Sequence, residues 1–425
     1  MTDFPAAVQR LASQHDLIPG EQLSVGVTAA LLGGPDALTQ AEAALAAQVA
    51  AGLLVPAATG ADDPALPGAP APRFHRVRPV LLDAGHPRDE PQQEAVDRVL
   101  KHLLLHATGA AEVLGPGKHR PYGDEVGPLP RFDGETAALR WFALEGDTVL
   151  AAQRRAWQLG MMAQVAQVGP ACWPWLRIAR RYEDQLAAQR LAAEAADSLD
   201  HVAASAAHSR VAWSLNALDR PEDALGVLAR ALEVADRHDD DWSRATALAT
   251  RGRSHRALDR VDEALADLYT ALDIDKQRLV LTPSGTESVP YTAIGLRWTE
   301  IAETHLHPRV GDGIEALRAA DHALAALTRD PHRRRETLRA HLVRGRALTA
   351  AGRPGDAVEA LRAAEELVDP ATDIYYLAAI THHRGDALAL TGEAEQAAAD
   401  HRAAVELYRD AGRHDLAEQL QQGLH

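Results

Sequence analysis

The sequence predicts an all-α protein, most of which is a solenoid of stacked helical hairpins. The phrase "ALDRPEDALGVLARAL" at 217–232 returns as "ALDRVDEALADLYTAL" at 257–272, which is 40 residues later. Two further copies, at 350–367 and 390–407, lie the same distance apart, and a degenerate copy covers 309–327. Self-similarity at such a period indicates units that cannot bury their apolar faces alone and must stack on one another.

The composition agrees with this fold class and excludes several kinds of protein. Hydrophobic residues make up 46% of the chain but aromatic residues only 4%, which favours helices packed through small side chains. The net charge of −16 argues against general affinity for nucleic acid or an anionic membrane, because phosphates attract basic surfaces. The sequence shows neither a signal peptide at its start nor an apolar run of about 18 residues, so we expect a cytoplasmic protein.

The first 85 residues predict a small domain that ends in helix, strand, loop and strand. The stretch 39–56 reads as a helix running into a short strand, 57–72 as a Pro/Gly/Ala-rich loop, and 73–85 as a second strand entering a helix. This order is typical of a winged helix. The segment has four arginines against eight acidic residues, whereas a DNA-recognition helix needs donors to bases and phosphates. We therefore expect a packing or switch domain without DNA contact.

The next two segments connect this domain to the repeats. Residues 86–133 predict a linker with one helix, in which "GPGKHRPYG" lacks the first glycine of a phosphate loop and has His119 where that loop needs Ser or Thr. Residues 134–201 predict irregular pairs of amphipathic helices. Cys172 is the only cysteine, which excludes an intrachain disulfide, and its apolar neighbours indicate a buried small residue at a helix boundary.

Residues 202–425 predict about five units, each consisting of helix A, a tight turn and helix B. The A helices are expected at 206–218, 245–258, 294–306, 338–350 and 378–390, and a polar loop is expected at 279–292. Pairs such as Asp219/Arg220 and Asp259/Arg260 close the turns. A small residue at the opening of each helix B is expected to let it approach helix A: Ala224, Ala264, Ala316, Ala357 and Ala397. A later alanine admits the next unit: Ala231, Ala271, Ala323, Ala364 and Ala404.

A small residue also recurs in helix A, as Ala212, Gly252, Ala302, Gly345 and Gly385. With the A–turn–B order, these residues resemble the tetratricopeptide repeat (TPR) family. The resemblance implies a right-handed superhelical solenoid with a concave groove lined by the A helices. The spacing near 40 departs from the family's 34, and Leu or Ala replaces most of its large aromatic residues. A HEAT-like pairing of helices is the structural alternative.

The upstream half is similar to a wider architecture. Trp141 and Glu145, followed by a Leu-Ala-Ala helix, resemble the segment before the repeats in actinobacterial NB-ARC and SARP-type (STAND) regulators. Phe74 and His75 loosely match the aromatic residue and histidine that close the winged helix of those proteins. Because no phosphate loop is found, the resemblance implies the sensor part of such a regulator without its NTPase module.

The same resemblance implies which side chains line the groove. The A-helix register places ten residues opposite the small ones: Trp213, Asn216, Arg253, Arg256, Thr299, Glu303, Arg346, Thr349, His382 and Asp386. Three of them are arginines, whose guanidinium groups suit carboxylates or phosphates. We therefore expect an acidic peptide or the C-terminal carboxylate of a protein as the partner. The alternative is that these arginines are solvated or pair with acidic residues of neighbouring units.

No enzymatic or metal-binding pattern emerges from the remaining residues. The pairs His305/His307 and His382/His383 lack further ligands at the spacing of a zinc site, so we expect them to be solvated or groove-lining. We predict no cofactor, no metal and no catalytic residue. The predicted function is a non-enzymatic protein-binding scaffold or regulatory sensor. Three alternatives stay open: presentation of a peptide substrate to a biosynthetic enzyme, catalysis involving Cys172 or His305/His307, and, as to assembly, a homodimer.

Overall fold

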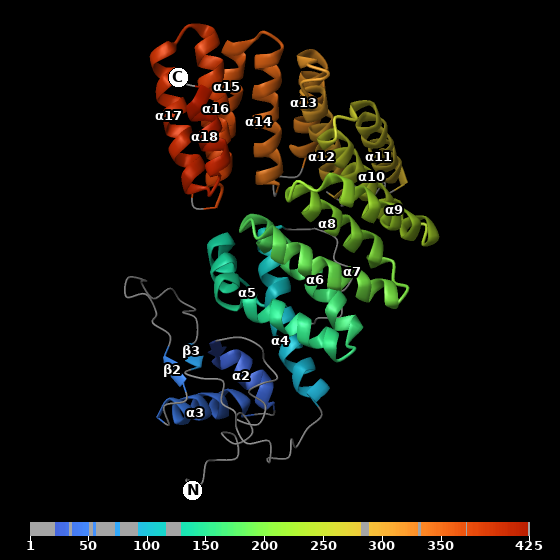
Figure 1. Ribbon diagram of the computed structural model, residues 1–425, viewed down its shortest axis with the longest axis vertical. Coiled ribbons are helices and arrows are strands. Elements are labelled where there is room, and N and C mark those ends of the chain that lie inside the picture. The colour runs from blue at the N-terminus through green and yellow to red at the C-terminus, as the bar shows by residue number, and fades with distance from the viewer. Residues whose placement is uncertain are drawn as a thin grey trace. The chain divides into compact units, whose positions relative to one another are not determined.

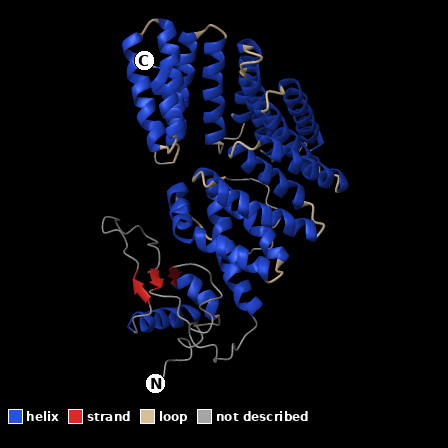
Figure 2. Ribbon diagram, viewed as in Figure 1, coloured by secondary structure: helices blue, strands red, loops and turns tan. Residues whose placement is uncertain are grey.

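A computed structural model gives the fold of the chain, whose helices, strands and loops are shown in Figures 1 and 2. The structure describes residues 22–33, 36–50, 54–56, 73–76, 92–115, 129–281, 289–329, 333–370 and 372–423. The sequence predictions for the loop at 57–72, for the helix after 76 and for the turn around His119 lie outside these residues. The chain divides into two units, 1–207 and 208–425, which are described separately.

The N-terminal unit begins with a small antiparallel sheet and two helices. The elements are β1 (Gln22–Ser24), α2 (Val25–Leu32), α3 (Ala37–Ala50), β2 (Leu54–Pro56) and β3 (Arg73–Arg76). The strand β3 lies between β1 and β2 and is antiparallel to both. Ser24 caps α2 by accepting a hydrogen bond from the Val27 amide at 3.2 Å. The helix and two strands predicted from the sequence match α3, β2 and β3, whereas β1 and α2 were not predicted.

The helix α4 (Gln92–Leu114) connects this part to a set of longer helices. It packs against α2 and also against α5 (Gly134–Gln158) and α6 (Met162–Ile178). Arg98 donates hydrogen bonds to the carbonyl oxygens of Ala30 at 3.1 Å and Leu31 at 2.7 Å. These carbonyls belong to the last turn of α2 and have no partner within that helix. The predicted linker helix therefore also caps the end of α2.

The helices predicted as irregular pairs share one type of turn. The helices α5, α6 and α7 (Tyr182–Ser198) are each followed by a residue with positive φ, namely Gly160, Arg180 and Asp200, about twenty residues apart. The same conformation recurs at a similar interval through the first repeats. The helix α6 continues through Pro170 and Pro174, so Cys172 is buried as predicted but lies inside a helix and not at its boundary.

The C-terminal unit is entirely helical in its described residues. Each A–turn–B repeat predicted from the sequence is present, and from α9 onward each helix packs against the next along the chain (Figure 1). The A helices are α8 (Ala203–Ala217, which reaches the unit at residue 208), α10 (Asp241–Ala257), α12 (Val289–His305), α14 (Arg334–Ala350) and α16 (Ile374–Thr391). The B helices are α9 (Pro221–Arg237), α11 (Val261–Leu281), α13 (Gly313–Leu327), α15 (Pro354–Glu365) and α17 (Ala394–Asp410), and α18 (His414–Gly423) follows.

Two details of this unit differ from the sequence prediction or extend it. Both helices beside the predicted loop at 279–292 extend into that range, because α11 continues to Leu281 and α12 begins at Val289, while 282–288 lie outside the described residues. The helices α10, α12, α14 and α16 also contact one another in that order. We call the five A helices the helix-A layer. The right-handed superhelix stays a prediction.

Small residues produce the close packing that the sequence predicts. A Cβ atom on Gly252 would lie 2.9 Å from Cγ of Leu268, and one on Gly345 would lie 2.5 Å from Cγ of Leu361. All ten alanines predicted for the helix B contacts are buried: Ala224, Ala231, Ala264, Ala271, Ala316, Ala323, Ala357, Ala364, Ala397 and Ala404. Larger side chains at these positions would separate the helices, so the repeated small residues determine the pairing distance.

The turns also have the predicted residues. Asp219 and Asp259 have φ angles of 57° and 61°, and the next residue in each turn donates its amide to a carbonyl five residues earlier. This is the hydrogen-bond pattern of a Schellman motif, which satisfies carbonyl groups at the end of helix A. None of the helices in the described part of the chain has the length and apolar character needed to cross a membrane.

Candidate functional site

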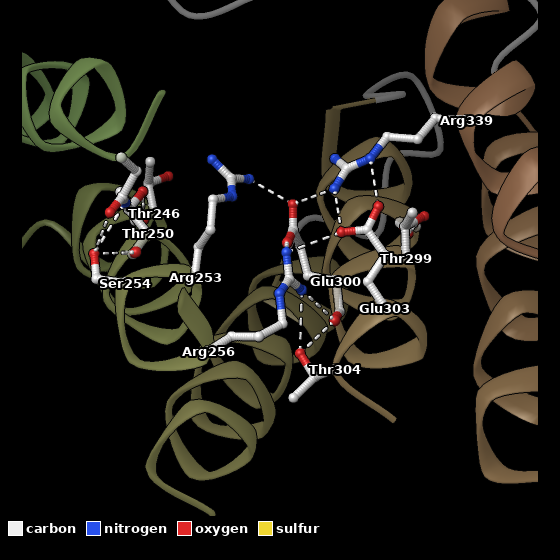
Figure 3. A network of polar contacts seen from close by, with 12 residues as sticks. Thr246, Thr250, Arg253, Ser254, Arg256, Thr299, Glu300, Glu303, Thr304 and Arg339 are labelled. Atoms are coloured by element: carbon white, nitrogen blue, oxygen red, sulfur yellow. Dashed lines mark hydrogen bonds and ion pairs between the residues drawn. The ribbon is translucent and has the colours of Figure 1, made fainter. Parts of the chain in front are cut away.

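A network of ion pairs joins three consecutive helices of the helix-A layer (Figure 3). Glu300 and Glu303 lie one turn apart on α12 and face arginines from α10 and α14. Nη2 of Arg253 lies 2.5 Å from Oε1 of Glu300, and Nη2 of Arg256 lies 3.1 Å from Oε2 of Glu300 and 3.0 Å from Oε2 of Glu303. Nη2 of Arg339, on α14, lies 2.7 Å from Glu300 and 2.8 Å from Glu303. The five side chains therefore connect the repeats through their charges.

The charges of this network are held firmly. The Glu300 side chain is 3% exposed, and burial alone would raise its pKa, but the positive charges of Arg253, Arg339 and Arg256 outweigh burial and hold its pKa well below the usual range. Burial similarly disfavours the charged form of Arg339, yet the two carboxylates raise its pKa well above the usual range. Three guanidinium groups meet two carboxylates, so the network carries one net positive charge.

The network changes the interpretation of the predicted site. It brings together Arg253, Arg256 and Glu303, which the sequence placed on one surface. Both arginines are paired with acidic residues of the next repeat. This pairing with a neighbouring unit was the alternative that the sequence analysis left open. Glu300 and Arg339 were missed. Helical spacing could have indicated both, because Glu300 lies one turn before Glu303, and Arg339 lies two turns before Arg346 on the same side of α14.

Two predicted residues of α8 contact the same region of α10. The ring of Trp213 lies 6.0 Å from Cζ of Arg253, within the range of a cation–π contact. The side chains of Asn216 and Ser254 exchange hydrogen bonds at 2.9 and 3.0 Å. The structure therefore places Trp213 beside the ion-pair network, while the polar groups of Asn216 are used between α8 and α10.

The two predicted threonines bond within their own helices. Thr299 donates to the carbonyl of Gly295 at 2.9 Å and is 1% exposed, so its expected position on an accessible surface is wrong. Thr349 donates to the carbonyl of Gly345 at 3.1 Å and is half-buried. A threonine hydroxyl commonly bonds back to the preceding turn of its helix. Neither hydroxyl adds a donor to the site.

A second polar cluster lies on the last helical pair. His382 and His383 stack with ring centroids 4.8 Å apart, and His383 Nδ1 lies 3.1 Å from Oδ2 of Asp386. His401, on α17, places Nε2 3.0 Å from the other oxygen of Asp386. The sequence predicted that His382 and His383 are solvated or groove-lining, and the structure shows both of them half-buried. The cluster also includes Tyr408, whose hydroxyl lies 3.4 Å from Nδ1 of His382.

Burial determines the protonation of this cluster. It lowers the pKa of His382 to about 4, with a further contribution from His383. It also lowers the pKa of His383, although the hydrogen bond that Asp386 accepts from this ring opposes the effect. Arg346 on α14 adds to the lowering of both values. Arg346 makes no ion pair with any residue in the described part of the chain, which distinguishes it from Arg253 and Arg256.

Cys172 and His307, which the sequence analysis considered for catalysis, lie in different surroundings. Cys172 is fully buried, and burial raises the pKa of its thiol to about 12, so it is protonated near neutral pH. Nε2 of His307 lies 3.2 Å from Oδ1 of Asp259. This contact connects the turn after α12 to the turn after α10, so His307 contributes to the packing of consecutive repeats.

Comparisons with known proteins found similarity to solved structures at low TM-scores. No family model and no curated protein sequence matches the chain. Among solved structures, BtubC (BKLC) from P. vanneervenii has a TM-score of 0.41 at 14% identity, covering 54% of this chain and 91% of that one. A Rap protein complexed with competence and sporulation factor has a TM-score of 0.41 at 13% identity, covering 76% and 88%. A STAND protein with a tetratricopeptide repeat sensor from Pyrococcus horikoshii has a TM-score of 0.29 at 14% identity, covering 98% and 65%. The helical hairpins of the C-terminal unit themselves show a TPR-like repeat fold, and the chain is similar to these solved structures at low TM-scores.

Proposed function

We propose that the chain is a non-enzymatic scaffold or regulatory sensor that binds a protein or peptide through its helix-A layer. The ion-pair network carries the proposal, because it holds charged groups at fixed positions across three helices. Arg253 and Arg339 remain about a quarter exposed at their side chains, with 25% and 23% of the surface accessible. A rigid array of this kind binds by presenting prearranged groups, since it has little backbone freedom to lose on binding.

The charge of the network indicates the kind of partner. Its net positive charge lies within a chain whose total charge is −16. Arg253 contacts Glu300 through Nη2, and a guanidinium group has five N–H donors, so further donors remain for a ligand. The ring of Trp213 beside Arg253 adds an apolar contact. These features favour an acidic peptide segment or a C-terminal carboxylate as the partner.

Alanine substitutions in the helix-A layer and in the B helices test this proposal. Full-length protein is used to capture partners from the native host, with the variants Trp213→Ala and Arg253→Ala. Arg318→Ala and Arg362→Ala, which remove exposed arginines from the B helices α13 and α15, are the controls. The first pair should lose most of the captured partner and the second pair should retain it. Equal capture by all four variants, with unchanged circular dichroism, would contradict the proposal.

The identity of the captured partner then distinguishes a regulatory protein from one that presents a substrate to an enzyme. A C-terminal peptide of the partner should bind about tenfold more weakly after amidation if the arginines recognise the carboxylate. A transcription regulator as the partner supports regulation. A peptide that a neighbouring enzyme modifies supports the second class, in which the protein presents a substrate to a biosynthetic enzyme.

We also propose that residues 22–76 form a winged-helix-like domain with a packing role. The order β1–α2–α3–β2–β3, with β3 between the other two strands, supports this assignment. The helix α3 has no Lys or Arg, so it offers no cationic donor to DNA phosphates. The protein should leave the electrophoretic mobility of duplex DNA unchanged at physiological salt. A retarded complex would contradict the packing role.

A further inference from the structure

The histidine cluster of α16 has donor atoms at the spacing of a metal site. One ligand atom each from His382, His383 and Asp386 lies within 4.8 Å of the other two. Nε2 of His382 and Nδ1 of His383 lie 3.7 and 3.1 Å from the same oxygen, Oδ2 of Asp386. A tetrahedral zinc ion with bonds of about 2.0–2.2 Å separates its ligand atoms by about 3.4 Å. Small side-chain movements would therefore let all three atoms reach one ion.

Contacts with His401 and Tyr408 orient these side chains, as outer contacts commonly orient metal ligands. His401 contacts the other oxygen of Asp386, at 3.0 Å, and so fixes the direction of the carboxylate. The hydroxyl of Tyr408 lies 3.4 Å from Nδ1 of His382, on the opposite side of the ring from the nitrogen that faces Asp386. Outer contacts of this type orient metal ligands and fix the histidine tautomer.

The other repeats provide an internal comparison for His401. A Cβ atom on Gly385 would lie 2.5 Å from Cδ2 of His401. In two sister repeats the equivalent glycine meets a fully buried leucine: Gly252 meets Leu268 and Gly345 meets Leu361. A repeat therefore packs well with leucine at this position. Burying an imidazole there costs free energy unless its nitrogens are satisfied, so packing alone does not explain the histidine.

The same comparison applies to the two histidines of α16. His382 and His383 precede Gly385 by the same steps as Leu342 and Val343 precede Gly345. Leu342 and Val343 are buried apolar residues. Three positions that are apolar in the preceding repeat are thus histidine in the last one, and all three surround a single carboxylate.

We propose that His382, His383 and Asp386 bind a divalent transition-metal ion of the zinc class, with His401 positioning the carboxylate. Zinc is bound by imidazole nitrogens and carboxylate oxygens, and three protein ligands leave a fourth position for water or for a group from a bound molecule. The positive charge of Arg346 on α14 lowers the pKa of both histidines, and the same charge would oppose a bound cation. This inference does not depend on the proposed partner-binding function.

Metal titrations of the untagged full-length protein test the site. After chelator treatment, isothermal titration calorimetry with zinc should give one saturable site per molecule. Cobalt should give the strong visible absorption of tetrahedral coordination. His383→Gln and Asp386→Asn should weaken binding about tenfold or more. A matched double variant, His305→Gln/His307→Gln, removes the other dense histidine pair and should bind as the wild type does.

Two further variants separate metal binding from folding. His401→Leu restores the residue of the sister repeats, so it should keep or raise the melting temperature of the metal-free protein while weakening zinc binding. Arg346→Gln removes the opposing charge and should tighten zinc binding. Absence of saturable zinc binding to the wild type would overturn the proposal. An equal loss of zinc binding in the His305→Gln/His307→Gln control would also overturn it. Weaker zinc binding by Arg346→Gln, at an unchanged melting temperature, would do the same.

Discussion

Individual turn residues show how the repeats tolerate unusual backbone conformations. Asp219 and Asp259 adopt positive φ angles that cost most L-residues about 1–2 kcal/mol, and aspartate is among the few that adopt them. Asp259 is further stabilised because its carboxylate accepts from Arg309 at 3.0 Å. Later turns have glycine in this position, for example Gly352 and Gly392. The turn geometry is therefore retained even though the residue changes.

Two glycine substitutions should have opposite effects on stability. Gly392→Ala places a Cβ atom at a left-handed position, with φ of 89°, and should lower the free energy of unfolding by about 1 kcal/mol. Gly226→Ala lies inside α9, where a Cβ atom would meet nothing within 4 Å, and should raise it by about 0.5–1 kcal/mol. Urea unfolding followed by circular dichroism measures both. Effects of the same sign would show that local backbone preference does not control these positions.

At the scale of the element, α12 depends on charges from both neighbouring A helices. Its two glutamates are paired by α10 on one side and by α14 on the other. Buried pairs of this kind fix the register of the helices, and removing one member leaves the others without compensation.

Glu300→Gln should therefore destabilise the protein by about 3–5 kcal/mol at pH 7. The folded-state pKa of Glu300 lies below its unfolded value, so its contribution is present above pH of about 4.3 and is lost as the pH falls through the folded pKa. The difference between wild type and variant in thermal or urea unfolding should consequently narrow below pH of about 4.3. Glu315→Gln, which removes an exposed ion pair with Arg318, is the control and should cost less than about 1 kcal/mol. A constant difference down to pH of about 3 would contradict this role of Glu300.

The helices were largely predictable from the sequence, but the side-chain contacts between them were not. Repeated alanines and glycines identify helices A and B, because only small residues allow close approach at those positions. The helix boundary predicted at Cys172 was wrong, because α6 continues through Pro170 and Pro174 although proline usually interrupts a helix. The pairing of Arg253 with Glu300 depends on the rotation of adjacent helices, which a single sequence does not specify. The contact between His401 and Asp386 was hidden for the same reason.

At the scale of the whole molecule, a repeat array distributes stability between neighbours. Leu361 of α15 is fully buried in a cluster with Leu338 and Leu342 of α14 and Ile380 of α16. Helices of such an array contact only near neighbours, so a defect in one cluster has little direct effect on distant repeats.

Leu361→Ala should therefore cause a local loss of stability. We expect a cost of about 2–5 kcal/mol from the lost apolar contacts and the cavity. Hydrogen–deuterium exchange should increase mainly in α14 to α17, while α10 and α11 keep most of their protection. Ala357→Gly, in the same helix, changes helix propensity without a large cavity and is the comparison. A uniform increase over the whole unit would indicate that it unfolds as one cooperative body.

The regular spacing of the turns has a consequence for how this architecture could change length. Similar left-handed turns follow successive helices at Gly160, Arg180, Asp200, Asp219, Asp239 and Asp259. Each of the six helices α5 to α10 thus ends in the same way whatever helix comes next. A hairpin duplicated or deleted between two such turns would leave every remaining junction with a geometry that the protein already uses. The array is in this sense modular, and the proposed binding surface could become longer or shorter without a new type of turn.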